Sequence, residues 1–104
     1  MNCEIAVIIP AYNEEEALSF VVRRLDKFFS RDQMILANDG STDNTLLIAK
    51  QLGLKTINGS VNRGKGYILR KSFQTIVSKN LKFRWILTFD ADGQHDSRDI
   101  PKFL

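Results

Sequence analysis

The sequence predicts an α/β fold in which a mainly parallel sheet carries helices on both faces. Two observations support this prediction. Segments with strand character and segments with helix character alternate along the chain, as in a doubly wound sheet. The first strand-like segment, residues 4–10, contains an unbroken aliphatic run from Ile5 to Ile9, which is typical of a strand buried on both faces. Right-handed crossovers between successive strands complete the layout.

The first 38 residues contain two predicted strands and one predicted helix. Residues 14–29 place apolar side chains at three- and four-residue spacing, which predicts a helix with one buried face. Asn13 and Glu16 have the spacing of a capping box at its start. Residues 33–38 are expected to form the second strand.

The rest of the chain continues the alternation. Turn and cap residues at 39–44 precede a short helix that should end at Gly53, where glycine is favoured. A weak third strand is expected at residues 54–57, followed by a loop at 59–66 and a third helix at 67–79. A fourth strand is expected at 84–89, and residues 97–104 look like the start of another helix. This order predicts a Rossmann-like domain, in which ligands bind at the carboxyl ends of the strands.

Composition limits the class of protein. A chain of 104 residues corresponds to one domain, and 43% hydrophobic with 26% charged residues excludes a disordered chain. The apolar runs are far shorter than the roughly 18 residues that span a bilayer, and the first residues lack a signal-peptide pattern. A single cysteine, Cys3, excludes an internal disulfide and fits a reducing compartment. We therefore expect a cytoplasmic location.

The charges are unevenly distributed. Nine basic residues and no acidic residue lie between Asn44 and Phe89. A solvated basic face explains this run, and so does a surface turned toward phosphates of a nucleotide or an anionic membrane. Nucleic acid is not expected as a partner, because aromatic residues are not interleaved with the basic ones.

Three predicted strand ends hold polar residues: 10–14, 38–41 and 90–95. Parallel strands bring their carboxyl ends to one edge of the sheet, so these groups should converge there. Asp90 and Asp92, with Gln94 beyond them, supply hard oxygen ligands for a divalent cation that would neutralise a diphosphate. A turn capped by the same side chains explains this segment equally well.

The other candidates also allow two interpretations. Asp39 either caps the turn that follows it or accepts a hydrogen bond from a base or ribose. Tyr12 either stacks on a base or packs against the protein. The flexible, basic segment 62–66 suits a phosphate, although it lacks the Rossmann and P-loop glycine patterns. Phe83, Trp85 and Phe89 are expected in the core.

Four segments together resemble the family 2 glycosyltransferases of the GT-A fold, in the family's order and spacing. They are VIIPAYNEEEAL (7–18), NDGSTDNT (38–45), VNRGKGYILRKSF (61–73) and FDADGQHD (89–96). The chain looks most similar to the branch that transfers mannose or glucose to dolichyl or polyprenyl phosphate. The resemblance implies a GDP- or UDP-sugar donor, Mg²⁺ or Mn²⁺, and a polyprenyl phosphate acceptor at the cytosolic face of a membrane.

The resemblance also implies individual site residues. Those expected to contact the nucleotide are Pro10, Tyr12, Glu14, Ala37, Asp39, Arg63, Gly64, Lys65, Asp90 and Ala91. Those expected at the metal are Asp90, Asp92 and Gln94. The chain departs from the family at Asn38, where an aspartate is usual. Asp39 is kept, so the contact with the base is expected to survive.

Length is the larger departure. The resemblance implies that Asp90, Ala91 and Asp92 form the family's DxD element. Family members continue beyond this element, so we expect this chain to be the donor-binding part, with an acceptor-activating residue beyond Leu104 and little activity alone. One alternative is a non-catalytic nucleotide-binding module on the same fold. Another is a haloacid-dehalogenase-like phosphatase with Asp90 as nucleophile, although that motif normally opens its domain. An incomplete sheet would also leave an edge open to self-association.

Overall fold

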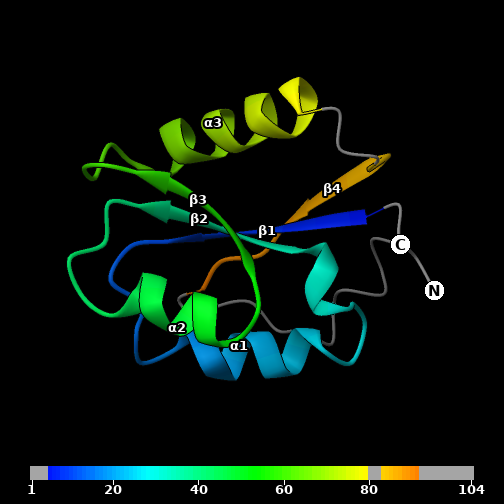
Figure 1. Cartoon of the computed structure of the whole chain (residues 1–104), viewed down its shortest axis with the longest axis horizontal. Helices are drawn as coiled ribbons and strands as arrows, with labels where there is room; N and C mark the ends of the chain where they lie inside the picture. Colours follow the sequence, from blue (N-terminus) through cyan, green and yellow to red (C-terminus); the bar gives the residue numbers. More distant parts are fainter. Residues whose placement is uncertain (1–4, 80–82, 92–104) are drawn as a thin grey trace.

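A computed structural model describes residues 5–79 and 83–91, which form a parallel four-stranded sheet between two layers of helices (Figure 1). The strand order is β3-β2-β1-β4. The elements in chain order are β1 (Ile5–Ala11), α1 (Leu18–Leu25), the 3₁₀ turn η1 (Arg31–Gln33), β2 (Met34–Asp39), α2 (Thr45–Gln51), β3 (Lys55–Gly59), α3 (Lys65–Ser78) and β4 (Trp85–Thr88). The predicted α/β fold is confirmed.

β1 is buried along its whole length because helices cover both faces of the sheet beside it. Val7 and Ile9 belong to the core beneath α1 and α2. Ala6 and Ile8, on the alternate face, belong to the smaller core beneath α3. Figure 1 shows the same division, with α3 on one side of the sheet and α1 and α2 on the other. The unbroken aliphatic run of β1 follows from this burial on both sides.

The direction of winding reverses next to β1. β2 pairs with one side of β1 and β3 continues outward from β2, whereas β4 pairs with the other side of β1. The carboxyl ends of β1 and β4 therefore flank the point where the strand order switches, which is where ligands bind in such sheets.

α1 is shorter than predicted, because residues on both sides of Leu18–Leu25 form turns instead of helix. The predicted capping box is wrong: Ala17 occupies the N-cap position, and Asn13 has a left-handed φ of 52°. The Asn13 side chain accepts hydrogen bonds from Thr42 and Asp43 in another loop. Tertiary hydrogen bonds replace the local cap here.

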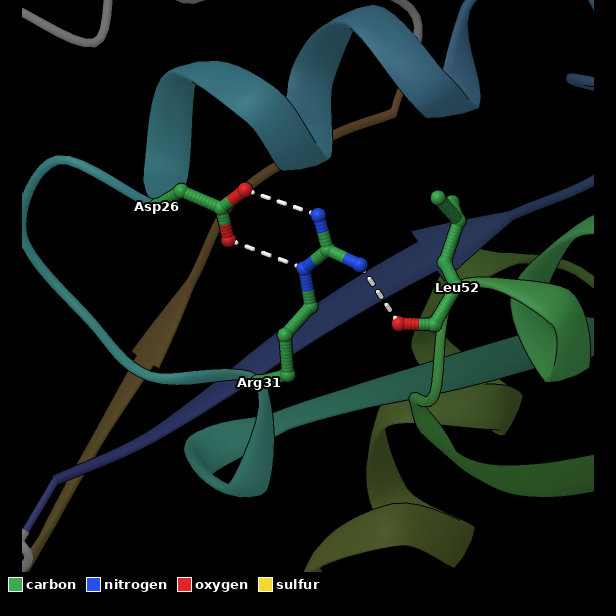
Figure 2. A network of polar contacts seen from close by, with 3 residues as sticks. All are labelled: Asp26, Arg31 and Leu52. Carbon is green, nitrogen blue, oxygen red and sulfur yellow. Dashed lines mark hydrogen bonds and ion pairs between the residues drawn. The ribbon is translucent and has the colours of Figure 1, made fainter.

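Arg31 joins the segment after α1 to the end of α2 (Figure 2). Its Nε and Nη2 donate to the two carboxylate oxygens of Asp26 at 2.9 and 2.8 Å. Its Nη1 donates to the Leu52 carbonyl at 2.6 Å, which satisfies one carbonyl at the end of α2. Hydrogen bonding from Arg31 lowers the pKa of Asp26 against a smaller opposing effect of burial.

The remaining boundaries differ from the prediction by one or two residues. Gly53 ends α2 with a left-handed φ of 81°, as predicted. β3 begins at Lys55, and α3 begins at Lys65 because Gly64, with φ 100°, occupies its N-cap position. The predicted helix at 97–104 lies outside the described residues.

The aromatic residues near β4 divide into buried and exposed groups. Phe89 is buried and Phe83 packs against the core beneath α3. The prediction that Trp85 lies in the core is wrong, since 65% of it is exposed. The reason is its place on β4, an outer strand of the described sheet. Self-association through such an edge stays a prediction.

Within the described ranges, no helix has the length and apolar character needed to cross a membrane.

Candidate functional site

A cavity of about 370 Å³ lies at the carboxyl ends of β1, β2 and β4, beside the start of α3. Eight of the ten residues expected to contact a nucleotide line it: Pro10, Tyr12, Glu14, Asp39, Gly64, Lys65, Asp90 and Ala91. The cavity thus lies at the switch point of the sheet, where the strand order predicts a ligand site.

The other two expected contacts do not line this cavity. Ala37 is fully buried in the core beneath α3. Arg63 is exposed and its guanidinium lies 5.3 Å from the ring centroid of Tyr67, outside the cavity wall. The expected metal ligands Asp92 and Gln94 lie outside the described residues.

Three further residues line the cavity that were not among the individual nucleotide contacts expected from the sequence: Ala11, Asn62 and Ile68. Ala11 and Asn62 lie within the predicted segments 10–14 and 62–66, whereas Ile68 lies in neither. Asn62 belongs to the basic segment 62–66, so that segment itself was the available signal. Ile68 is the first fully buried residue of α3, and helical periodicity alone indicates only that it faces the core. Ala11 is the last residue of β1 and reaches the cavity through its position there.

Asp39 anchors the loop of residues 60–64 that precedes α3. Its Oδ1 accepts a hydrogen bond from the Arg63 amide at 2.9 Å, and its Oδ2 accepts one from the Gly64 amide at 2.8 Å. The Asn62 side chain also accepts from the Gly64 amide, at 3.1 Å. Only 4% of Asp39 is exposed. This carboxylate is therefore bound to main chain that lies 24 and 25 residues further along.

Lys65 and Asp90 form an ion pair across the cavity. The Lys65 ammonium lies 2.7 Å from Oδ1 and 2.8 Å from Oδ2 of Asp90. Lys65 comes from the start of α3 and Asp90 follows β4, so the pair joins two elements that flank the cavity. The side chain of Lys65 is 57% exposed and that of Asp90 18%. A solvent-accessible cation at this place is available to an anionic ligand.

Main-chain amides that follow β1 bind side chains that follow β2. The amides of Asn13 and Glu14 donate to the hydroxyls of Ser41 and Thr45 at 3.0 and 2.9 Å. In the opposite direction, the Asn13 side chain accepts from the Thr42 amide at 2.8 Å. We call this set of contacts the loop bridge. It fixes the chain at Asn13 and Glu14, directly after Tyr12. Tyr12 and Glu14 line the cavity.

Asp43 completes the loop bridge. Its carboxylate accepts hydrogen bonds from the Glu15 amide at 3.3 Å and from the amide and hydroxyl of Thr45. Burial alone would raise the pKa of Asp43, but these hydrogen bonds outweigh burial and lower it. Asp43 is therefore charged at neutral pH and holds both loops.

Asn38 serves the sheet and not the cavity. Its Nδ2 donates to Asn58 Oδ1 at 3.1 Å, and its Oδ1 accepts from the Ser41 amide at 3.1 Å. It is buried and is not among the cavity-lining residues. The departure from the family's usual aspartate therefore changes a contact between β2 and β3.

One of the three expected metal ligands, Asp90, lies among the described residues. Asp90 has a hard carboxylate at the cavity wall, of the kind that Mg²⁺ and Mn²⁺ prefer. Within residues 5–79 and 83–91, no three His, Cys, Asp or Glu side chains gather closely enough to hold a metal. Asp90 therefore fits the predicted metal site, and the other two predicted ligands, Asp92 and Gln94, lie outside the described residues.

Comparison with known proteins identifies the family. Residues 6–104 match the profile of glycosyl transferase family 2. The chain belongs to this family. Membership in glycosyl transferase family 2 decides against the phosphatase interpretation of Asp90.

Several similar family members are named for lipid-phosphate sugar chemistry. The chain is 35% identical to UDP-N-acetylglucosamine–dolichyl-phosphate N-acetylglucosaminyltransferase of Methanococcus voltae, with 96% of this chain and 45% of that protein covered. It is 34% identical to dolichyl-phosphate beta-glucosyltransferase of Saccharomyces cerevisiae, with 96% and 33% covered. The chain thus spans less than half the length of these curated relatives.

A solved structure has the same fold. Glucosyl-3-phosphoglycerate synthase of Mycobacterium tuberculosis, in complex with Mn²⁺, UDP and glucosyl-3-phosphoglycerate, superposes with a TM-score of 0.73 at 23% identity. The match covers 93% of this chain and 37% of that one. The predicted GT-A fold of this family 2 domain is thereby confirmed.

Proposed function

We propose that this domain binds the nucleotide-diphosphate sugar donor, a GDP- or UDP-sugar, of a glycosyltransferase. The observation that carries the proposal is the cavity at the switch point of the sheet, which collects eight of the residues expected at such a donor. The relatives support the donor class, because one is named for UDP-N-acetylglucosamine and a structural neighbour contains UDP.

The cavity-lining residues have distinct roles in this proposal. Tyr12, 43% exposed, offers a ring face on which a base can stack. Lys65 offers its ammonium to the diphosphate, whose negative charge competes with the Asp90 carboxylate for it. Asp90, with Asp92 and Gln94, would hold Mg²⁺ or Mn²⁺. When bound, the metal would neutralise the diphosphate and act as a Lewis acid for its departure.

The acceptor in this proposal is a polyprenyl phosphate at the cytosolic face of a membrane. Its phosphate is already anionic, so it needs less activation than a sugar hydroxyl. The names of the dolichyl-phosphate relatives support this choice. The exposed basic residues Arg70 and Lys79 on and after α3, a helix without acidic residues, suit an anionic lipid surface.

Calorimetric titration with GDP, UDP and their sugars tests the donor proposal, with Mn²⁺ and then with EDTA. We expect binding that requires the metal and is lost in Asp92→Ala. Asp32→Asn, which removes an exposed carboxylate in η1, is the matched control and should bind as the wild type does. Metal-independent binding, or equal binding by Asp92→Ala, would contradict the assignment of the aspartates.

A further inference from the structure

We infer that the outer face of α3, formed by Tyr67, Arg70, Phe73 and Val77, lies on an anionic lipid bilayer with its apolar side chains among the headgroups. The inference rests on the proposed function and deepens it, because it assigns the surface by which the domain reaches a lipid-phosphate acceptor. Basic residues alone would attract the domain to anionic lipid. The apolar residues between them fix which face touches it.

The first argument is the exposure of apolar side chains on α3. Phe73 is 39% exposed and Val77 is 77% exposed. They are four residues apart, so they are neighbours on one side of the helix. The residues that α3 buries against the sheet are Ile68, Ser72 and Ile76. Exposed apolar side chains with polar residues around them mark surfaces that bind a membrane or another protein.

The second argument is that basic side chains lie among the apolar ones. Arg70 is exposed and lies three residues after Tyr67 and three before Phe73, a spacing that places helical neighbours side by side. The Arg63 guanidinium lies 5.3 Å from the centroid of the Tyr67 ring. Arginine binds phosphate groups, and tyrosine is enriched where a bilayer meets water. This face therefore offers both kinds of contact that a lipid headgroup region provides.

The third argument is the difference in charge between the two layers of helices. Residues 55–88, which contain β3, α3 and β4, have no acidic residue. The opposite layer carries both signs, with Glu16 and Asp26 exposed near the ends of α1 and Arg23 and Lys27 exposed beside them. An anionic surface is therefore attracted most to the side of α3. Figure 1 shows α3 as the outermost layer on its side of the sheet.

The cavity lies at the beginning of the same helix. Lys65 is the first residue of α3 and lines the cavity, and Gly64 lines it from the N-cap position. A helix that lies flat on a bilayer keeps all its turns near the headgroups. The start of α3 then brings the cavity to the level of the lipid phosphates. A polyprenyl phosphate reaches the donor there while its chain stays in the bilayer.

Co-sedimentation with vesicles of equal parts phosphatidylglycerol and phosphatidylcholine tests the inference. Phe73→Ser and Val77→Glu change α3, and Phe20→Ser on α1 and Leu47→Glu on α2 are matched controls at exposed positions of the other layer. We expect each α3 variant to lower the partition coefficient by roughly fivefold or more, because it removes an apolar contact with the lipid. The controls should stay within about twofold of wild type. Phe73→Ser leaves the charge unchanged, so attraction by charge alone predicts no loss for it.

Three results would overturn the inference. One is equal binding of the wild type to these vesicles and to pure phosphatidylcholine, and another is an equal loss in the α3 variants and the controls. The third is a wild type that dimerises without lipid while Val77→Glu stays monomeric in sedimentation velocity, because the face would then bind a second copy.

Titration with UDP and GDP in the presence of Mn²⁺ separates this inference from the proposed donor function. Val77→Glu should bind both nucleotides as the wild type does, which shows that the variant is folded. If the wild type binds a nucleotide and ignores anionic vesicles, the donor function stands and the inference about α3 fails. If the wild type binds vesicles through α3 and binds no nucleotide, the donor function fails and the inference stands.

Discussion

Replacing Gly40 by alanine should destabilise the fold more than the same change at Gly53 or Gly66. Gly40 has a left-handed φ of 73°, which costs a residue with a Cβ about 1–2 kcal/mol. Its Cβ would also collide with main-chain atoms of Val61 and Asn62, which move only if the whole loop moves. Forced overlap of this kind costs roughly a further 1–3 kcal/mol. We therefore expect a loss of about 2–5 kcal/mol in the free energy of unfolding.

The other two glycines provide matched controls for the two contributions. Gly53 has a similar φ of 81° with nothing near its missing Cβ, so Gly53→Ala should lose only about 1–2 kcal/mol. Gly66 is the second residue of α3, with open space around it and no positive φ. Gly66→Ala should therefore gain a little stability, at most about 0.5–1 kcal/mol, which is the full effect in the middle of a helix.

Urea unfolding followed by circular dichroism measures all three variants. The midpoints should rank Gly66→Ala above wild type, then Gly53→Ala, then Gly40→Ala, with similar slopes. If Gly40→Ala is as stable as Gly53→Ala, the close approach between Gly40 and the 60–64 loop does not exist in solution. The 60–64 loop would then pack less closely against the end of β2 than the structure shows.

Three further changes test other parts of the structure. Asn13→Ala should lose roughly 1–2 kcal/mol, since it removes a loop-bridge acceptor and puts alanine at φ 52°, and Asn13→Gly should recover part of this loss in urea unfolding. Asp26→Asn should lose about 0.5 kcal/mol at pH 7, a small effect because water screens this half-exposed pair with Arg31. The pKa of Asp26 is lowered in the folded state, so the stability difference between wild type and Asp26→Asn should be fully present above pH 3.8, the ordinary pKa, and vanish as the pH falls through the folded pKa. A stability difference that persists in acid would contradict the ion pair between Asp26 and Arg31. Arg70→Glu should weaken sedimentation with anionic vesicles. Lys27→Glu, which follows α1 on the opposite face of the sheet, should not. Equal binding of the wild type to anionic and neutral vesicles would contradict the membrane proposal.

The parts of the fold that were predictable are those specified by local patterns. The aliphatic run of β1 and the spacing of Leu18, Val21, Val22 and Leu25 on α1 encode burial directly, and these residues are buried. The cavity also followed from a general rule, because parallel strands bring their carboxyl ends together and Asp39 and Asp90 occupy such ends.

The parts that escaped prediction depend on contacts between distant residues. Asn13 has the local sequence of a helix cap, but its partners lie 29 and 30 residues away. Asp39 has the sequence of a turn residue or base acceptor, and its hydrogen bonds go to a loop that no local pattern connects to it. The exposure of Trp85 depends on which strand lies at the edge of the described sheet, a property of topology and not of the residue.

The most direct test of the central claim is to locate the bound nucleotide by nuclear magnetic resonance. Substoichiometric Mn²⁺ broadens the signals of nearby amides, and UDP or GDP shifts the signals of the residues that it contacts. We predict that both effects centre on the amides of Ala11, Tyr12, Gly64, Lys65 and Asp90, which surround the cavity at the carboxyl ends of β1 and β4. Effects centred on the outer faces of α1 and α2, or no effect of the nucleotide on the cavity amides, would contradict the claim that this cavity is the donor site.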